Sequence, residues 1–421
     1  MLTTLRNAWK IPDLRKKLIY TMMMIVIFRL GAAIPVPGID KAKLAELFTN
    51  SGEGLIGFFN LMSGGSFKNF TIFALGISPY ITASIIMNLL QIAIPSLEAL
   101  AKEGEEGRKK MARYTRYGTV VLALIQAFGF SVGIFRNAFI SPGTLSILVS
   151  VVTLTAGVAF LMYLGEKITE NGIGNGISLF IFAGIISRLP GGIITTAMRI
   201  RTGDVNVLNV LIFVIVAIAV IVGVIYIQEG KRKIPVQYAK RVIGRKMYGG
   251  QSTHIPLKVN QAGVIPVIFA MSLLMFPITI SQFWPNSGFY YWISNNMNTQ
   301  TVLYNVLYAI LIIFFTYFYT SVTFNPIEVA TNMKENGGYI PGIRPGRPTS
   351  DYLNRTLTRI TLAGAIFLAT IAILPNIILA LGSLDIRFGG TSLLIAVGVS
   401  LDTTKQIEAQ MMMRHYKGFL G

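Results

Sequence analysis

Lysine and arginine side chains are the groups in this sequence most able to bind another molecule, and they gather in two segments. Residues 229–258 contain eight basic residues and one acid, and residues 325–359 contain five basic residues and four prolines. A guanidinium presents a fork of donors that suits carboxylates and phosphates. These segments could hold anionic lipid head groups, at about 1 kcal/mol per charge near a membrane, or dock a large acidic partner such as ribosomal RNA. The residues alone leave both interpretations open.

Groups that could perform catalysis or hold a metal are sparse. The chain has no cysteine, which excludes disulfides and thiolate sites. Its two histidines, His254 and His415, lie far apart in polar segments and do not resemble a metal site. No GxxxxGK[ST] loop for nucleotide phosphates and no nucleophile with a positioned base are present. We therefore expect no catalytic residue, no metal and no cofactor, and we expect that the protein is not an enzyme.

The composition indicates a membrane protein. Of 421 residues, 53% are hydrophobic and only 13% charged, with a mean hydropathy of +0.60, whereas soluble proteins carry about 25% charged residues. Apolar segments near the length that spans a bilayer lie at 18–36, 72–94, 117–135, 145–164, 175–189, 207–227, 262–283, 302–324, 360–381 and 389–405. We expect an all-α integral membrane protein with ten transmembrane helices.

The distribution of charge predicts the orientation. Ten spans place both termini on one side, and the outer segments then hold only eight of the 37 basic residues: Lys41, Lys43, Lys68, Arg136, Arg188, Arg199, Arg201 and Arg387. Cytoplasmic loops carry the excess of lysine and arginine, so both termini are expected in the cytoplasm. The first apolar segment is full length and lacks a small-residue cleavage site, so we expect a retained helix.

The segment 55–70 does not fit a span or an ordinary loop. It is rich in glycine, serine and asparagine but also contains several phenylalanines. It could be an amphipathic stretch on the outer face. It could also be a re-entrant element sheltered by protein, because lipid cannot satisfy irregular backbone.

Charged residues are nearly absent from the middle of the predicted spans. Asp402 and Glu166 lie near inner ends, and Arg29 is the one charge well inside a span, with a partner that the sequence does not reveal. Ion-coupled transporters usually need ionisable groups at this depth. Any path through the bundle would therefore be lined by apolar and neutral polar groups, and aliphatic constrictions can act as gates. Composition does not identify which isoleucines would form one.

Motifs along the whole chain carry a family resemblance. They are FALGISPYITASIIMNLL at 73–90, IPVPGID at 34–40, NLMSGGS at 60–66, EGEEGRKKMARYTRYGT at 103–119, LGEKITENGIGNGIS at 164–178, YAKR at 238–241, QSTHIPLKVNQAGVIP at 251–266, PGIRPG at 341–346 and FGGTSLLI at 388–395. In these segments the sequence resembles the SecY family of channel-forming subunits of the bacterial Sec protein-conducting machinery.

The resemblance implies an architecture and a set of site residues. Two inverted five-helix halves, 1–200 and 201–421, would enclose an hourglass pore with a short re-entrant plug helix within 55–70. The pore ring would be Ile77, Ile81, Ile177, Ile181, Ile268 and Ile395, and the plug Phe59, Asn60, Leu61, Met62, Ser63, Gly64, Gly65, Ser66 and Phe67. The lateral gate would include Asn88, Gln126 and Ser272, and the docking surface Arg241, Arg245, Lys246, Arg344 and Arg347.

The implied function is translocation of unfolded secretory polypeptides across the bacterial plasma membrane, with sideways release of transmembrane segments into lipid. The expected partners are the membrane subunits SecE and SecG, the motor ATPase SecA, the ribosome, signal sequences, unfolded substrates and anionic lipids. A secondary transporter for a small solute would explain the helices but not the missing mid-membrane acids or the basic loops. A non-conducting ribosome receptor would explain the loops but not the motifs of the pore helices.

Overall fold

The computed structural model of the chain describes residues 2–50, 60, 63–203, 206–238, 241–243, 246–248, 252–281, 283–284, 287–298, 301–381 and 390–417. Its helices are α1 (Leu2–Lys10), α2 (Pro12–Gly31), α3 (Lys41–Asn50), α5 (Ser78–Ala93), α6 (Pro95–Lys102), α7 (Glu105–Val132), η1 (Arg136–Ala138), α8 (Thr144–Asn171), α9 (Gly176–Thr202), α10 (Val207–Glu229), α11 (Ile265–Ser281), α12 (Gly288–Asn296), α13 (Val302–Thr323), α14 (Pro326–Glu335), α15 (Arg347–Leu381) and α16 (Gly390–Lys417). The strands are β1 (Lys231–Tyr238), β2 (Arg241–Ile243), β3 (Lys246–Tyr248), β4 (Ser252–Lys258) and β5 (Gly338–Tyr339).

Each of the ten apolar segments coincides with a helix, but the number of spans is confirmed only in part. Within the described ranges, six helices are long and apolar enough to cross a membrane, namely α7, α8, α9, α10, α13 continued by α14, and α15. The pair α5 and α6, bent by 102°, makes a seventh if it is counted as one span. Two further apolar helices do not meet this requirement of length and low charge. Helix α11 has only 17 residues, and α2 carries four basic side chains. The protein is thus a multi-pass membrane protein, and the count of ten stays a prediction.

The fifth helix departs from the expectation. The sequence analysis ended this span near 189 and placed Arg188, Arg199 and Arg201 in an outer segment. Instead α9 continues through Pro190 and ends at Thr202, with Gly203 as its C-cap. The three arginines therefore lie on a helix, and the expected boundary between the halves at 200 falls in its last turn.

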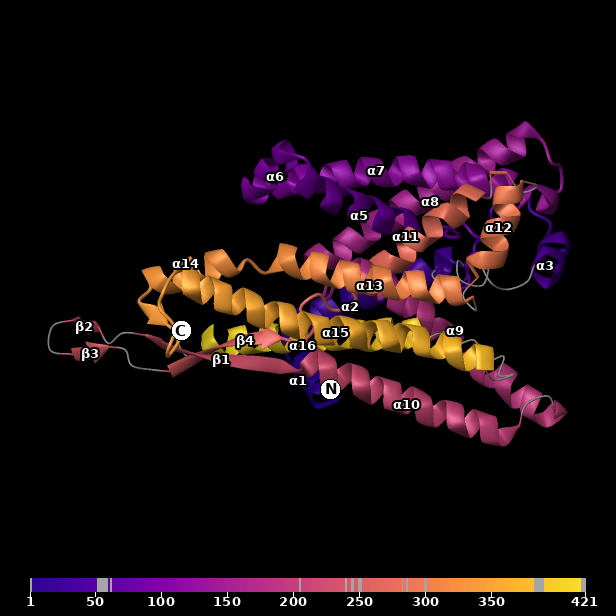
Figure 1. The fold of residues 1–421 in the computed structure, drawn as a ribbon. Helices are drawn as coiled ribbons and strands as arrows, with labels where there is room; N and C mark the ends of the chain where they lie inside the picture. Colours follow the sequence, from indigo (N-terminus) through magenta and orange to yellow (C-terminus); the bar gives the residue numbers. More distant parts are fainter. Residues whose placement is uncertain are drawn as a thin grey trace.

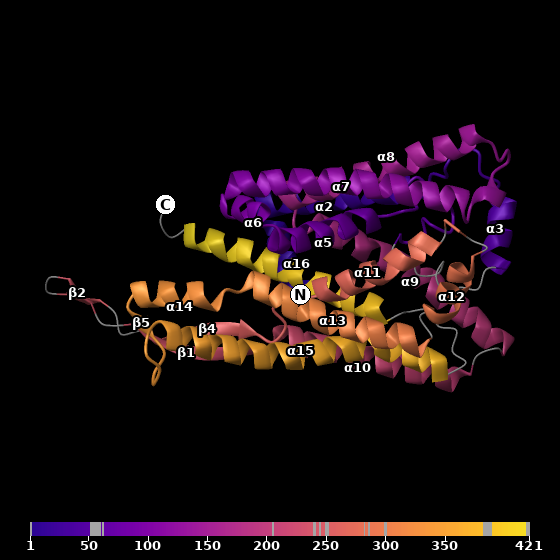
Figure 2. The ribbon, with the colours of Figure 1, turned by 45° about the horizontal axis from the view of Figure 1, so that its top comes forward.

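The long helices run in roughly the same direction and leave extramembrane elements at both ends (Figure 1). Helices α3 and α12 lie at one end of the bundle, and α6, α14 and the strands lie at the other. In Figure 2, α2 and α5 to α8 form one side of the molecule and α10, α13, α14 and α15 form the other. Helix α11 lies between these sides and contacts α5, α7, α13 and α15.

The apolar side chains divide between the interior and the outer surface. Most of α11 is buried, including Val267, Ile268 and Ala270. On α10, by contrast, Ile218 and Val222 are 56% and 60% exposed. A helix that exposes this much apolar surface is stable when lipid covers it. Helix α10 therefore marks the lipid-facing perimeter, and α11 the centre.

A small sheet, which the sequence analysis did not predict, accompanies the helices of this mainly helical fold. Strand β1 pairs antiparallel with β4 and with β5, in the order β4-β1-β5, and β2 pairs with β3. In β1, Ile234 and Val236 are buried between exposed neighbours, the period of two that a half-buried strand requires. They join a separate core with Leu257, Met333, Ile340 and Leu353. This core fixes the basic segment 229–258 to α14 and α15.

Candidate functional site

The six isoleucines of the predicted pore ring come from four separate regions of the chain. Ile77 and Ile81 belong to the start of α5, Ile177 and Ile181 to α9, Ile268 to α11 and Ile395 to α16. Five of them are at most 6% exposed, and Ile177 is partly buried. All six belong to or pack against one hydrophobic cluster in the centre of the bundle. Helix α5 contacts α11, and α9 contacts α16.

Local geometry places the α5 isoleucines. Gly76, with φ of 56°, adopts a left-handed conformation that residues with a Cβ rarely take. The chain can therefore turn sharply into α5, where Ile77 is the N-cap and Pro79 occupies the first turn. Proline is tolerated there because the N–H groups of the first turn have no helical partner. Ile77 and Ile81 then lie one turn apart, both buried.

Polar contacts from distant helices place the start of α9. In the loop before it, the backbone N–H of Ile173 donates to Thr21 Oγ1 of α2 over 3.0 Å. The N–H of Gly174 donates to Gln406 Oε1 of α16 over 2.7 Å. Asn175 Oδ1 then caps α9 by accepting from the N–H of Ser178. Ile177 and Ile181 are thus oriented by contacts with the first and last long helices.

The seam predicted to open sideways lies where α5 and α7 meet α11. Asn88 is half-buried on α5, Gln126 is 6% exposed on α7, and Ser272 is 3% exposed on α11. Gln126 Oε1 is buried without a hydrogen-bond partner in the described part of the chain. Phe128 of α7 stacks on Phe283, with ring centroids 6.5 Å apart. The seam thus combines polar side chains with an aromatic contact.

The predicted plug lies only partly within the described residues, since Phe59, Leu61 and Met62 fall outside them. Of the described residues, Asn60 is helical and residues 63–70 are turns. Asn60 Oδ1 accepts a hydrogen bond from the N–H of Lys68, and Ser63 Oγ accepts one from the N–H of Phe67. Both asparagine and serine favour such side-chain turns. The predicted plug helix is not confirmed by this part of the chain and stays a prediction.

Aromatic side chains fasten this turn to α7 and the segment after it. Phe67 and Phe70 are fully buried. The Phe67 ring meets those of Phe130 and Phe135 edge-on at 5.3 and 5.2 Å, and Phe70 lies 4.1 Å from Phe135. Edge-on aromatic pairs stabilise a fold by about 0.5–1.5 kcal/mol beyond their buried area. The 63–70 turn is thus anchored on one side by aromatic packing.

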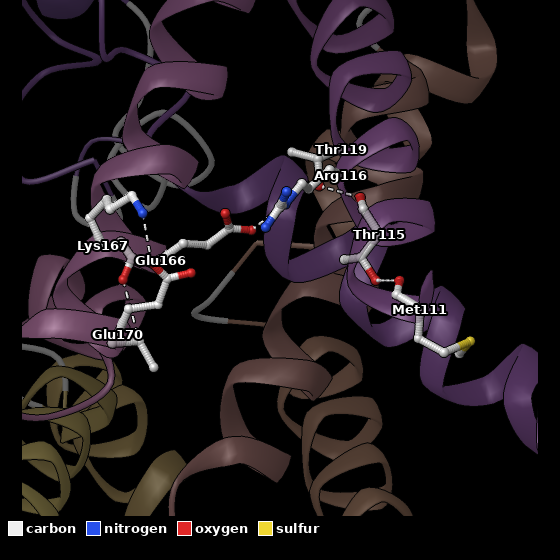
Figure 3. A network of polar contacts seen from close by, with 9 residues as sticks. Met111, Thr115, Arg116, Thr119, Glu166, Lys167 and Glu170 are labelled. Carbon is white, nitrogen blue, oxygen red and sulfur yellow. Dashed lines mark hydrogen bonds and ion pairs between the residues drawn. The ribbon is translucent and has the colours of Figure 1, made fainter. Parts of the chain in front are cut away.

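Charged residues near the helix ends are paired. Arg116 Nε of α7 lies 2.7 Å from Glu166 Oε1 of α8, and Figure 3 shows the two side chains reaching toward each other. Lys405 Nζ of α16 lies 2.7 Å from Glu229 Oε1 of α10. The sequence analysis missed both pairs, because the partners lie far apart in the chain. Among the residues searched, no group of three or more histidines and acids could hold a metal ion.

Arg29 has a backbone partner rather than an acid. Its Nη1 donates to the carbonyl oxygen of Gly64 over 3.3 Å. Among the described residues, the Gly64 carbonyl is the hydrogen-bond acceptor for the Arg29 guanidinium. No sequence signal could have identified it, because every residue carries a carbonyl.

The predicted docking residues lie on the sheet side of the bundle. Arg344 and Arg347 are exposed. The Arg344 carbonyl accepts a hydrogen bond from Thr349 Oγ1 over 2.9 Å, so its turn is held while its side chain remains free to bind. Arg241 and Lys246 belong to β2 and β3, which project from the bundle in Figure 1. Arg245 lies outside the described residues.

Solved structures with the same fold define the class. The chain superimposes with a TM-score of 0.67 on a structure described as "The structure of a protein conducting channel", covering 94% of this chain and 92% of that one at 22% identity. It superimposes with a TM-score of 0.64 on Sec61 in the canine ribosome-channel complex from the endoplasmic reticulum, with the same coverage at 21% identity. The fold is therefore that of the SecY/Sec61 class of membrane proteins.

Sequence comparison narrows the class to one family. The family model of SecY matches residues 71–404. The chain is 50% identical over 433 residues to the protein translocase subunit SecY of Halalkalibacterium halodurans, with both chains covered completely. It is 45% identical over 428 residues to the subunit of that name from Thermus thermophilus, covering 100% of this chain and 98% of the relative. The chain belongs to the SecY family, which also confirms the prediction that it is not an enzyme.

Proposed function

We propose that this chain is the central subunit of a protein-conducting channel in the bacterial plasma membrane, with both termini in the cytoplasm. It translocates unfolded secretory polypeptides and releases transmembrane segments sideways into lipid. The observation that supports the proposal is that Ile77, Ile181, Ile268 and Ile395, at the start of α5 and on α9, α11 and α16, are all buried in the large hydrophobic cluster of the bundle. Aliphatic side chains seal against water and ions without selecting one substrate sequence.

The seam between α5 and α11 serves as the lateral gate. An apolar segment of the substrate that reaches the seam partitions toward lipid, with a gain of roughly 0.3–0.6 kcal/mol per Leu, Ile, Phe or Val at mid-depth. The plug at 55–70 leaves the outer funnel as the gate opens. The two halves, 1–200 and 201–421, move apart around the isoleucine ring.

The energy for translocation comes from partners. The sequence has no phosphate-binding loop, whereas the exposed Arg344 and Arg347 suit an acidic or phosphate-bearing surface. SecA or a ribosome docks there through Arg241, Arg245, Lys246, Arg344 and Arg347. SecE and SecG cover part of the outward apolar surface, and anionic lipid head groups bind the basic segments 229–258 and 325–359.

The test exploits the absence of cysteine from the chain. Single cysteines replace Ile77, Ile268 or Ile395, the protein is reconstituted with its motor, and a substrate with one cysteine is stalled in transit. Disulfides should form at the three ring positions. The matched control is Ile218→Cys on α10, a residue that is 56% exposed on the perimeter and should not react.

Absence of cross-links at every ring position, while the loops still bind ribosome or motor, would favour a non-conducting ribosome receptor. Cross-linking at Ile218 equal to that at the ring would show random collision rather than a path. A secondary transporter would give no cross-link to a polypeptide at any position.

A further inference from the structure

The turn formed by residues 63–70, here called the Gly64 turn, makes one close backbone contact with α9, in addition to the packing of its phenylalanines. Gly64 lies against Gly184 in the middle of α9. A Cβ built at Gly64 would lie 2.7 Å from the Cα of Gly184, closer than real Cβ atoms approach. A Cβ built at Gly184 would lie 3.1 Å from the Cα of Gly64. The two backbones therefore touch because neither residue has a side chain.

The conformation of Gly64 adds a second requirement. Its φ of 64° lies in the left-handed region that L side chains rarely adopt. The turn can present its carbonyl oxygen toward α2 because glycine accepts this conformation. Arg29, two residues before the end of α2, donates to that oxygen over 3.3 Å.

The position of Arg29 makes this bond important. The structure places Arg29 in the last turn of α2 rather than well inside a span, and no carboxylate of the described residues lies within ion-pair distance of it, so the Gly64 carbonyl is the protein acceptor for its charged donors. Its side chain is exposed, so water or another acceptor can replace the Gly64 carbonyl when the turn moves away. The positive charge of Arg29 strengthens its hydrogen bond to Gly64. The exposure of the Arg29 side chain allows this hydrogen bond to break and re-form.

We propose that Arg29, Gly64 and Gly184 form a latch that holds the Gly64 turn in place in the resting channel. The inference rests on the proposed function, because it assigns the latch to the segment that would plug the pore. The glycine pair sets the position of the turn on α9, and the guanidinium of Arg29 fixes it from α2. Arg29 is thus a positioning residue whose contact breaks when the turn leaves its seat.

The test measures how often the turn opens, without substrate or motor. Ser66, within the turn, is 1% exposed, and its Oγ is buried without a hydrogen-bond partner in the described residues. Ser66→Cys therefore introduces a single thiol at little structural cost. A membrane-impermeant maleimide is added to the reconstituted protein from the outer side. When opening and closing are fast, the labelling rate follows the population of the open turn.

Arg29→Gln in the Ser66→Cys background should raise the labelling rate about tenfold, which corresponds to about 1.4 kcal/mol. Arg29→Lys, which keeps a charged donor without the fork, should give a smaller increase. Arg136→Gln removes an exposed arginine from η1 and should leave the rate unchanged.

The glycine contact is tested by a second pair of variants. Gly184→Ala should also raise the rate, because its Cβ presses on Gly64. Gly191→Ala on the same helix is the matched control, since a Cβ there meets nothing within 4 Å. Rates within twofold of the parent for both Arg29→Gln and Gly184→Ala would overturn the latch even if the ring cross-links form. The variants could also label faster while the ring isoleucines never cross-link to substrate. The contact would then hold the turn in place, but it would have no role in a channel.

Discussion

The Nε atom of Arg116 donates to Oε1 of Glu166 over 2.7 Å and so ties α7 to α8 near the end of the bundle where α6 lies (Figures 1 and 3). The Glu166 side chain is 23% exposed and that of Arg116 is 46% exposed. The pair is thus less hydrated than a typical surface ion pair. Because α7 also carries Gln126 at the predicted gate, this bond restrains one wall of the seam.

The first prediction concerns the strength of this pair. A double-mutant cycle with Arg116→Gln and Glu166→Gln should give a coupling energy of about 1 kcal/mol, at the upper end of measured exposed pairs. The measurement is thermal unfolding of the purified protein in detergent. The matched control is the pair Lys102 and Glu98 on α6, whose side chains are 74% and 51% exposed. Its coupling should be about 0.3–0.5 kcal/mol, and equal couplings would contradict the role of burial.

The second prediction concerns the seal. Ile81→Asn, Ile181→Asn and Ile395→Asn together should make the resting channel leak ions, because polar side chains keep a narrow constriction wet. The measurement is conductance in planar bilayers without motor or substrate. The triple change to valine at these positions keeps an aliphatic lining and should leave the resting conductance low. Equal conductance of the Asn and wild-type channels would remove these isoleucines from the seal.

The sequence predicted the long helices well, because a bilayer demands about 20 consecutive apolar residues and such runs are visible in any window. It could not locate the ring from composition, since most isoleucines in such helices face lipid or neighbouring helices. The ring residues came from the family resemblance alone. Their shared burial agrees with that assignment.

The contacts that the sequence missed are non-local. Strand β1 pairs with β5 across about a hundred residues, as in the pairing of Gln237 with Tyr339. The alternation of Ile234 and Val236 within a charged segment is the sequence signal for this strand. The hydrogen bond from Arg29 to Gly64 had no signal, because a backbone carbonyl accepts in the same way at every position.

The third prediction concerns docking. Arg344→Ala should weaken binding of SecA or ribosomes to the reconstituted protein by about tenfold, because a guanidinium bound to carboxylate or phosphate contributes about 1.5–3 kcal/mol. Arg344→Lys should lose part of this affinity, since lysine keeps the charge without the fork. Binding is measured at two salt concentrations, because phosphate contacts weaken as salt rises.

The control for docking is Lys43→Ala on α3, at the end of the bundle opposite the sheet (Figure 1). This exposed lysine should have no effect on binding. A loss of affinity equal to that of Arg344→Ala would mean that net charge rather than the 341–346 turn governs docking.

The fourth prediction concerns Gln126 at the seam between α7 and α11. Its buried Oε1 has no hydrogen-bond partner among the described residues, and an unsatisfied buried acceptor costs about 1–3 kcal/mol. Gln126→Leu removes this cost from the closed seam while keeping a similar volume. The closed state should become more stable, so weakly hydrophobic signal sequences should open the gate less often and strongly hydrophobic ones almost as often as before.

The measurement is translocation of two substrates that differ only in the hydrophobicity of their signal sequence. Val121→Ala, which changes an apolar residue that is 58% exposed on the same helix, is the control and should not discriminate between the two substrates. Unchanged selectivity in the Gln126→Leu protein would mean that the gate opens elsewhere than along α7.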